Sequence, residues 1–150
     1  MNRVICVAIV AGLVGTTVLT AGCNKPSVAQ AEPIHPASVE KIDGSAISRV
    51  TLSEDAMQRL DVQTGAVTEA KSPRTGATQK AVPYAALIYD PQGNCWVYTS
   101  PNARVFVRAP IDVDYIQDGM VYLKDGPAPG TTVATVGVAE LYGTEFTVGH

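Results

Sequence analysis

The hydrophobic and polar positions divide the chain into three parts. Residues 4–18 are almost all apolar or small, and none of them is charged. Residues 24–45 contain three prolines and show no apolar period, so they cannot bury enough surface to offset the entropy of an ordered chain. The rest of the chain carries short apolar runs separated by turn-forming residues. We therefore expect a leader, a flexible tether and one folded body.

The folded body is predicted to begin with a strand and a short helix. Residues 47–52 alternate apolar and polar side chains, which is typical of a half-buried strand. Ser53 is a favourable helix N-cap, and the acids that follow it suit the positive end of the helix dipole. Ala56, Met57 and Leu60 then share one face at helical spacing. This spacing predicts a single helix of about two turns.

Short strands joined by turns are expected in the rest of the body. Residues 105–116 form the longest predicted strand, which is bent near Pro110, and Asp118-Gly119 is a strong hairpin signal. Residues 69–78 are polar and are predicted to form a loop. The other expected strands cover residues 61–68, 81–89, 95–99, 120–123 and 131–137.

Strands at this spacing predict a mainly β fold, a small β-barrel or β-roll of short antiparallel strands with one short helix. The predicted domain covers residues 47–150, and its last part, residues 138–150, either adds a short helix or runs irregularly. About 100 residues of this kind can build one modest hydrophobic core.

The leader has the parts of a secretory signal. Arg3 precedes the apolar run, and the segment ends in Leu19-Thr20-Ala21-Gly22-Cys23. A basic start, a short apolar stretch and small residues before a cleavage site define such a signal. The apolar run is short for a helix that spans a membrane.

The end of the leader resembles the lipobox of bacterial lipoproteins, with Thr20 at a position where that family favours Leu. The resemblance implies cleavage between Gly22 and Cys23 and acylation of Cys23. Two acyl chains hold a protein stably at a bilayer. We therefore expect a signal helix at residues 1–22 and a lipid-anchored, disordered tether at residues 23–46.

Charge and cysteine content exclude two classes of protein. The chain has 14 acidic and 11 basic residues, a net charge of -3, and this balance argues against a nucleic-acid partner. Cys6 would leave with the signal peptide and Cys23 would be a thioether, so Cys95 would be the one free thiol of the mature chain. An internal disulfide is therefore not expected.

Few residues have the spacing of a catalytic or metal site. His35 lies in the predicted tether and His150 at the other end of the sequence, so no histidine-based triad or zinc site is indicated. Asp112 and Asp114 share one face of the long strand and are interpreted as a solvated face, and Cys95 as a small buried hydrophobe. We expect neither an enzyme nor a cofactor. The alternative is a periplasmic or surface lipoprotein that binds a metal or small ligand through Cys95, His150 and the acidic strand face.

Two blocks follow one another along the folded body. Residues 50–67 read VTLSEDAMQRLDVQTGAV, and residues 82–141 include VPYAAL, WVY, FVRAPIDV and PGTTVATVG. In this order they resemble the β-barrel and membrane-proximal parts of the periplasmic adaptor, or membrane fusion, subunits of RND-type efflux pumps. The resemblance extends over roughly 100 residues, about the size of one small domain.

This chain departs from that family between the two blocks. The adaptors carry a lipoyl-like domain and a long α-helical hairpin there, whereas residues 69–80 are predicted here to be a short loop. The resemblance implies an accessory or truncated adaptor-like subunit that acts by contact with a membrane transporter or adaptor protein. Its expected location is the cell envelope, on the outer face of the plasma membrane or in the periplasm, anchored to the bilayer through acylated Cys23. No catalytic, cofactor or metal residues carry over from the family.

Overall fold

The computed structural model describes residues 35–147. The predicted signal peptide, the cleavage pair Gly22 and Cys23, and His150 all lie outside the described residues. Within the described part, no helix is both long and apolar enough to cross a membrane.

The fold is mainly β, as the alternation of apolar and polar residues predicted. Within the described residues, ten strands are accompanied by two short α-helices and one 3₁₀ turn. The elements in chain order are β1 Ala37–Lys41, β2 Ser48–Leu52, α1 Glu54–Arg59, β3 Gln63–Ala66, β4 Thr68–Lys71, β5 Thr78–Pro83, η1 Tyr84–Ala86, β6 Ile88–Tyr89, β7 Cys95–Asn102, β8 Val105–Gln117, β9 Met120–Asp125, β10 Thr132–Val136 and α2 Val138–Thr147.

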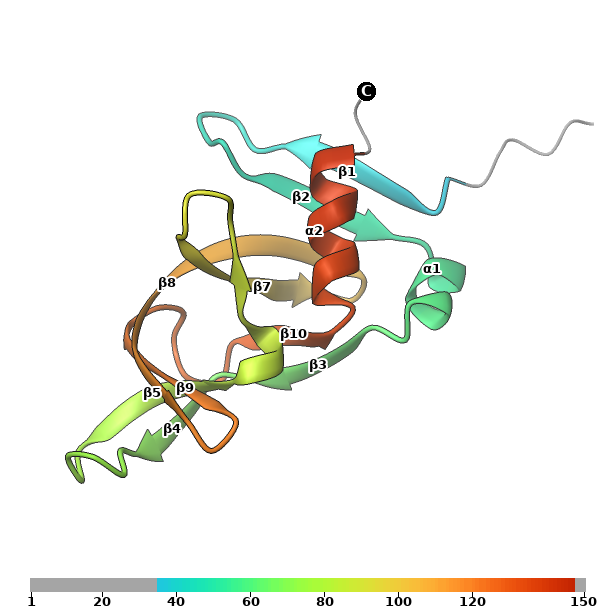
Figure 1. Ribbon diagram of the computed structural model, residues 1–150. Helices are drawn as coiled ribbons and strands as arrows, with labels where there is room; N and C mark the ends of the chain where they lie inside the picture. Colours follow the sequence, from blue (N-terminus) through green and yellow to red (C-terminus); the bar gives the residue numbers. More distant parts are fainter. Residues whose placement is uncertain (1–34, 148–150) are drawn as a thin grey trace, which may run out of the picture. The chain divides into compact units, whose positions relative to one another are not determined.

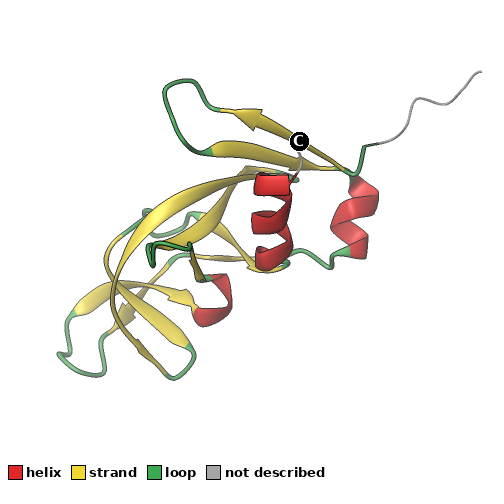
Figure 2. Ribbon diagram, turned by 45° about the horizontal axis from the view of Figure 1, so that its top comes forward, coloured by secondary structure: helices red, strands yellow, loops and turns green. Residues whose placement is uncertain are grey.

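The strands form one antiparallel sheet that curls into an open half-barrel (Figure 1). Its main order is β3-β10-β7-β8-β9-β5-β4. The β1–β2 hairpin is attached through β2 to the first part of β8, and β6 pairs with β7. Both α-helices lie beside this β1–β2 hairpin (Figures 1 and 2).

The long strand β8 joins the two parts of the sheet. It pairs with β7 from Val105 to Ile111 and with β9 from Asp112 to Gln117. The change of partner comes between Ile111 and Asp112, close to Pro110, and the register with β9 shifts on both sides of Val113. The bend predicted near Pro110 is therefore confirmed, because a strand that leaves one partner and joins another must turn out of the first ladder.

The sheet buries apolar side chains on both of its faces. On β7, Tyr98 belongs to the cluster under α1 and α2, whereas its neighbour Val97 belongs to the cluster shared with β5, β9 and η1. On β10, Ala134 and Val133 divide in the same way. Successive strand residues point to opposite faces, so each central strand contributes to both clusters.

The two helices cover one face of the sheet. Ser53 caps α1 as predicted, since its hydroxyl oxygen accepts a hydrogen bond from the backbone N–H of Ala56 at 3.1 Å. For the segment after β10, the sequence allowed either a short helix or an irregular chain, and the structure shows the helix α2. Val138 and Leu141 of α2 are buried against the sheet.

The folded unit begins earlier than the sequence predicted. Residues 37–46 were assigned to the tether, but β1 occupies Ala37–Lys41 and pairs along its whole length with β2. Only Ala37 and Val39 of β1 turn toward the core, so its apolar signal is too short to mark a strand without its partner.

The segment predicted as a loop also contains paired strands. Residues 68–71 form β4 and pair with the first residues of β5, so that only residues 72–77 remain as the turn. This hairpin escaped the sequence analysis because Thr68, Glu69 and Lys71 are exposed and the strand carries no alternating apolar pattern. Ser72 anchors the turn, since its hydroxyl lies 2.7 Å from the Tyr115 hydroxyl.

The junction between β10 and α2 depends on a glycine. Gly137 has φ +79°, and a Cβ added to it would lie 2.9 Å from Cγ2 of Val62. We expect Gly137→Ala to lower the free energy of unfolding by about 1–2 kcal/mol through the left-handed backbone and by about 1–3 kcal/mol more through the clash. Urea unfolding of the purified protein measures both contributions together.

Gly130 is the matched control for Gly137. It has a similar φ of +85°, but no atom lies within 4 Å of the position of an added Cβ. Gly130→Ala should therefore lower the free energy of unfolding only by the contribution of the left-handed backbone, about 1–2 kcal/mol. Equal losses of stability in the two variants would contradict the close approach of this junction to Val62.

Candidate functional site

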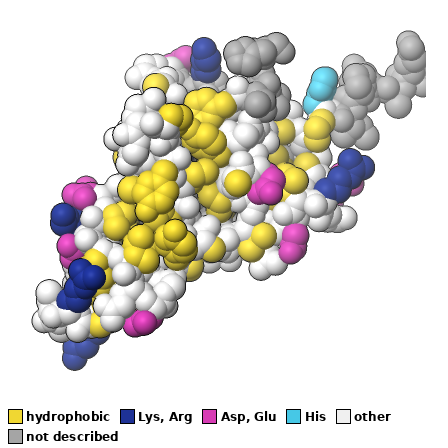
Figure 3. Space-filling view, viewed as in Figure 1, with side chains coloured by type: hydrophobic (Ala, Val, Ile, Leu, Met, Phe, Trp, Pro, Cys, Tyr) yellow, Lys and Arg dark blue, Asp and Glu magenta, His cyan; other side chains and the backbone are white. Residues whose placement is uncertain are grey.

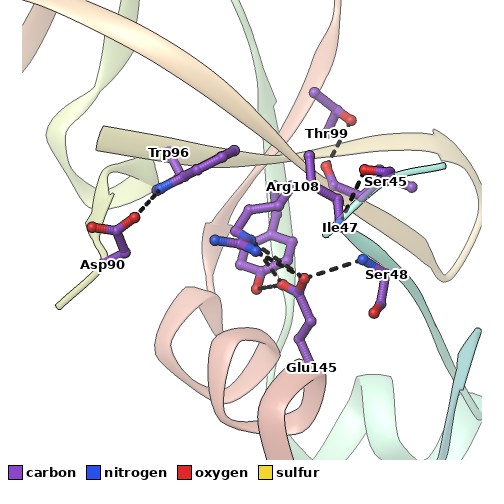
Figure 4. A network of polar contacts seen from close by, with 10 residues as sticks. Ser45, Ile47, Ser48, Asp90, Trp96, Thr99, Arg108 and Glu145 are labelled. Carbon is purple, nitrogen blue, oxygen red and sulfur yellow. Dashed lines mark hydrogen bonds and ion pairs between the residues drawn. The ribbon is translucent and has the colours of Figure 1, made fainter. Parts of the chain in front are cut away.

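A buried ion pair connects α2 to the sheet. Arg108 of β8 and Glu145 of α2 have side chains that are only 7% and 1% exposed, and Arg108 Nε lies 3.0 Å from Glu145 Oε2. Arg108 Nη2 donates a second hydrogen bond to Glu145 Oε1 at 3.2 Å. The guanidinium therefore meets the carboxylate side-on with two nitrogens (Figure 4). This two-point geometry is the strong form of an Arg–carboxylate contact.

Two further groups satisfy the same carboxylate. Tyr98 of β7 donates its hydroxyl proton to Glu145 Oε2 at 2.5 Å, and the backbone N–H of Ser48 in β2 donates to Oε1 at 3.3 Å. Tyr98 and Arg108 are register partners on adjacent strands, so the ladder itself places them side by side. Glu145 thus connects one helix to three strands of the sheet.

The position of Glu145 works against the helix dipole. It lies in the last turn of α2, which contains no basic residue, and a negative charge is unfavourable at that end. Its burial is compensated by Arg108 and by the two hydrogen bonds from Tyr98 and Ser48. Burial, followed by the hydrogen bond to Glu145, raises the pKa of Tyr98 far above its ordinary value, so the phenol stays a proton donor.

Aromatic rings surround the guanidinium of Arg108. Its Cζ lies 4.3 Å from the ring centroid of Trp96, 5.1 Å from that of Phe146 and 5.9 Å from that of Tyr142. The rings of Tyr142 and Phe146 are themselves 4.7 Å apart. Arginine stacks well on aromatic faces because its charge is spread over a plane. One edge of the guanidinium faces Glu145, and the three rings lie around it.

A hollow of about 570 Å³ opens above this group, and we call it the Arg108 hollow. Its lining comes from the chain between β1 and β2, the turn between β6 and β7, the two central strands and α2, namely Ala46, Ile47, Asp90–Gln92, Trp96, Arg108, Tyr142 and Phe146. Figure 3 shows that hydrophobic side chains gather in the middle of one face of the molecule, with most charged side chains toward its periphery.

Asp90 holds the rim of the Arg108 hollow in place. Its carboxylate accepts hydrogen bonds from the backbone N–H groups of Gln92 and Asn94, from the Asn94 side chain and, at 3.0 Å, from Nε1 of Trp96. Burial alone would raise the pKa of Asp90, but the hydrogen bonds from Asn94, Trp96 and Gln92 outweigh it and lower that pKa. The turn and the Trp96 ring are therefore fixed together (Figure 4).

The residues that the sequence singled out do not converge on this hollow. Cys95 is half-buried against the other cluster of the sheet, in agreement with its interpretation as a small hydrophobe. Asp112 and Asp114 are exposed, and Asp114 accepts a hydrogen bond from the Gln79 side chain. His35 is exposed as well. Among residues 35–147, no three His, Cys, Asp or Glu side chains are close enough together to hold a metal ion.

The central pair of the site was not among the predicted site residues, although the sequence carries a signal for it. On β8, Arg108 occupies an inward position between buried Phe106 and buried Ile111, where the alternation calls for an apolar residue. On α2, Glu145 falls on the stripe that begins with Val138 and Leu141. One basic and one acidic residue at inward positions of two elements predict a buried pair, because neither can be buried alone.

Removing one partner of the buried pair should destabilise the fold strongly. We expect Glu145→Ala to lower the free energy of unfolding by about 3–5 kcal/mol, because Arg108 stays buried without its counter-charge. Replacing both partners, as Arg108→Met with Glu145→Leu, should recover most of that loss, since apolar residues of similar volume can take their place. Denaturant titrations compare the variants.

The exposed pair between Arg49 and Glu40 is the matched control. Arg49 Nη1 lies 3.5 Å from Glu40 Oε2, and the two side chains are 48% and 65% exposed. Glu40→Ala should change the free energy of unfolding by no more than about 1 kcal/mol. A loss of that small size for Glu145→Ala would contradict the role given to the buried pair.

The thiol of Cys95 should react slowly. Burial, followed by the nearby charges of Asp112 and Asp90, raises its pKa, so less reactive thiolate is present at a given pH. We expect alkylation by iodoacetamide near pH 8 to be several-fold slower than that of a free cysteine. Asp112→Asn should accelerate it, whereas Asp114→Asn should not. Peptide mass spectrometry resolves the site, and an equal effect of both variants would contradict the assigned cause.

Comparisons with known proteins add no further constraint on this site. No protein-family model, curated protein or solved structure matches the chain.

Proposed function

We propose that this protein is a membrane-anchored accessory or truncated adaptor-like subunit of an RND-type efflux system, which acts by protein–protein contact and not by catalysis. Acylated Cys23 would hold it to the bilayer in the cell envelope, on the outer face of the plasma membrane or in the periplasm. Its partner would be a membrane transporter or an adaptor protein. The support comes from the two sequence blocks at residues 50–67 and 82–141 and from the fold in which they lie.

The observation that carries the proposal is the hairpin between the two blocks. Lys71 at the end of β4 pairs directly with Thr78 at the start of β5. The two chain ends at this point are therefore adjacent, and six residues, 72–77, connect them. In the adaptor family, the lipoyl-like domain and the helical hairpin are inserted between the corresponding blocks.

Adjacent chain ends are the geometry that tolerates an insertion or its loss. A domain inserted between two paired strands enters and leaves at one place, so the host sheet is undisturbed whether the insertion is present or absent. The β4–β5 hairpin therefore fits an adaptor body without its membrane-bridging parts. Such a body keeps the portion that, in the family, lies near the inner-membrane transporter.

The metal-binding alternative has no comparable observation in its favour. Cys95 is half-buried with a raised pKa, and the side chains of Asp112 and Asp114 form an exposed strand face. The described residues gather no set of three ligands, and His150 lies outside them. A thiolate ligand would first have to be deprotonated, and the raised pKa works against that.

Capture from membranes tests the proposed function. We expect the tagged full chain, cross-linked in its native cells and purified from detergent extracts, to enrich an RND-type transporter or adaptor subunit that is identified by mass spectrometry. Cys23→Ser should move the protein from the membrane fraction to the soluble fraction and reduce that enrichment at least several-fold, because the anchor keeps it beside its partner.

Another lipoprotein carrying the same tag controls for capture through the bilayer alone. Recovery of no transporter or adaptor subunit above that background would reject the proposal. Retention of the Cys23→Ser variant in the membrane fraction would reject the lipid anchor separately.

A further inference from the structure

We propose that the Arg108 hollow is a binding site for an aromatic ring that carries an uncharged carbonyl oxygen, with the ring against Trp96 and Phe146 and the oxygen on Arg108. This site is separate from the proposed contact with a transporter, since it needs no partner protein. Two sources share the same chemistry, a free aromatic amide or ester and an aromatic side chain within a peptide.

The floor of the hollow offers guanidinium hydrogen-bond donors that are not engaged by Glu145. Nε and Nη2 of Arg108 are bonded to Glu145, whereas Nη1 takes no part in that contact. In Figure 4, one nitrogen end of the guanidinium points away from Glu145. A carbonyl oxygen in the hollow would complete the donor set of Arg108.

The walls of the hollow are aromatic and fixed. Trp96 is held by its hydrogen bond to Asp90 and by the guanidinium at 4.3 Å from its ring centroid. Phe146 lines the hollow and packs on Tyr142 with 4.7 Å between ring centroids, and 47% of its surface is exposed. A ligand ring that packs on Phe146 and Trp96 removes this exposed apolar surface from water.

The charges around the hollow select an uncharged ligand. Glu145 already neutralises Arg108, and Asp90 is the one other charged residue among the described lining residues. A ligand carboxylate would bring another negative charge to a site that already holds two carboxylates and one guanidinium. A ligand ammonium would find the oxygens of Asp90 occupied by hydrogen bonds from the turn and from Trp96. A neutral carbonyl avoids both costs.

The size of the hollow agrees with a fragment-sized ligand. Its volume of about 570 Å³ lies within the range of about 300–1,000 Å³ that is usual for small-molecule sites. A mostly apolar lining with a few convergent polar groups is also typical of such sites. Here the convergent groups are Arg108 at the floor and the Asp90 turn at the rim.

The protein carries its own reporter, because Trp96 is its only tryptophan. Four probes can be titrated into the full chain in detergent while Trp96 emission is followed: N-acetyl-phenylalaninamide, benzamide, N-acetyl-phenylalanine with its free carboxylate, and N-acetyl-leucinamide. We expect a saturable change in the millimolar range with the first two, as for fragment-sized ligands. The carboxylate and the leucine compounds should bind about 10-fold more weakly or less.

The two amides distinguish the sources of the chemistry. Tighter binding of N-acetyl-phenylalaninamide would assign the site to an aromatic side chain of a peptide, and tighter binding of benzamide would assign it to a free small molecule. Either result supports the site. No saturable change with either amide, or equal affinity for the carboxylate compound, would overturn the proposal.

Phe146→Ala removes one wall while both partners of the buried ion pair stay in place, and it should weaken binding of the amides at least about 5-fold. Tyr84→Ala is the matched control, because Tyr84 is similarly exposed at 51% but does not line the hollow. The affinity of the Tyr84→Ala variant for the two amides should equal that of the wild type. Unchanged affinity in Phe146→Ala, in a protein that unfolds at its normal denaturant concentration, would also overturn the proposal.

Discussion

The buried contact between Arg108 and Glu145 is the constraint on which the position of α2 depends. Neither charge can be buried without the other, so the helix must sit where its last turn meets the first part of β8. Apolar packing of Val138 and Leu141 would tolerate a small shift of the helix, but a two-nitrogen contact with a carboxylate would not. The pair therefore sets the placement of α2 more than it adds to net stability. The Arg108 hollow follows from that placement, because Tyr142 and Phe146 are carried by the same helix.

The alternation of side chains predicted most of the sheet because that signal is local. The bent β8, its Asp118-Gly119 hairpin and the capped α1 each depend on neighbouring residues, and each was found. The strands β1 and β4 were missed for the opposite reason. Both lie at edges of the sheet and expose most of their side chains, so their strand conformation comes from the partner strand.

The candidate site was largely hidden from the sequence because its members are far apart along the chain. Tyr98 and Arg108 are brought together by strand register. Glu145 lies 37 residues after Arg108, in a segment for which the sequence did not decide between a helix and an irregular chain. An arginine at an inward strand position and a glutamate on an apolar helix stripe were each visible. Their convergence was not, since no local pattern states which helix covers which strand. The hollow depends on that same long-range packing.

The arrangement of α2 also determines how this part of the molecule can open. Helices usually lose their terminal turns first, because end residues make the fewest contacts. Here the last turn carries the buried ion pair, and Val138 and Leu141 of the first turn are buried against the sheet. Because both ends of α2 are held against the sheet, unfolding of the helix turn by turn from one end is unfavourable. We therefore expect α2 to detach as a whole or to stay in place. The helix and the central strands under it then form one cooperative unit, in which a loss of order at either end is transmitted to the other.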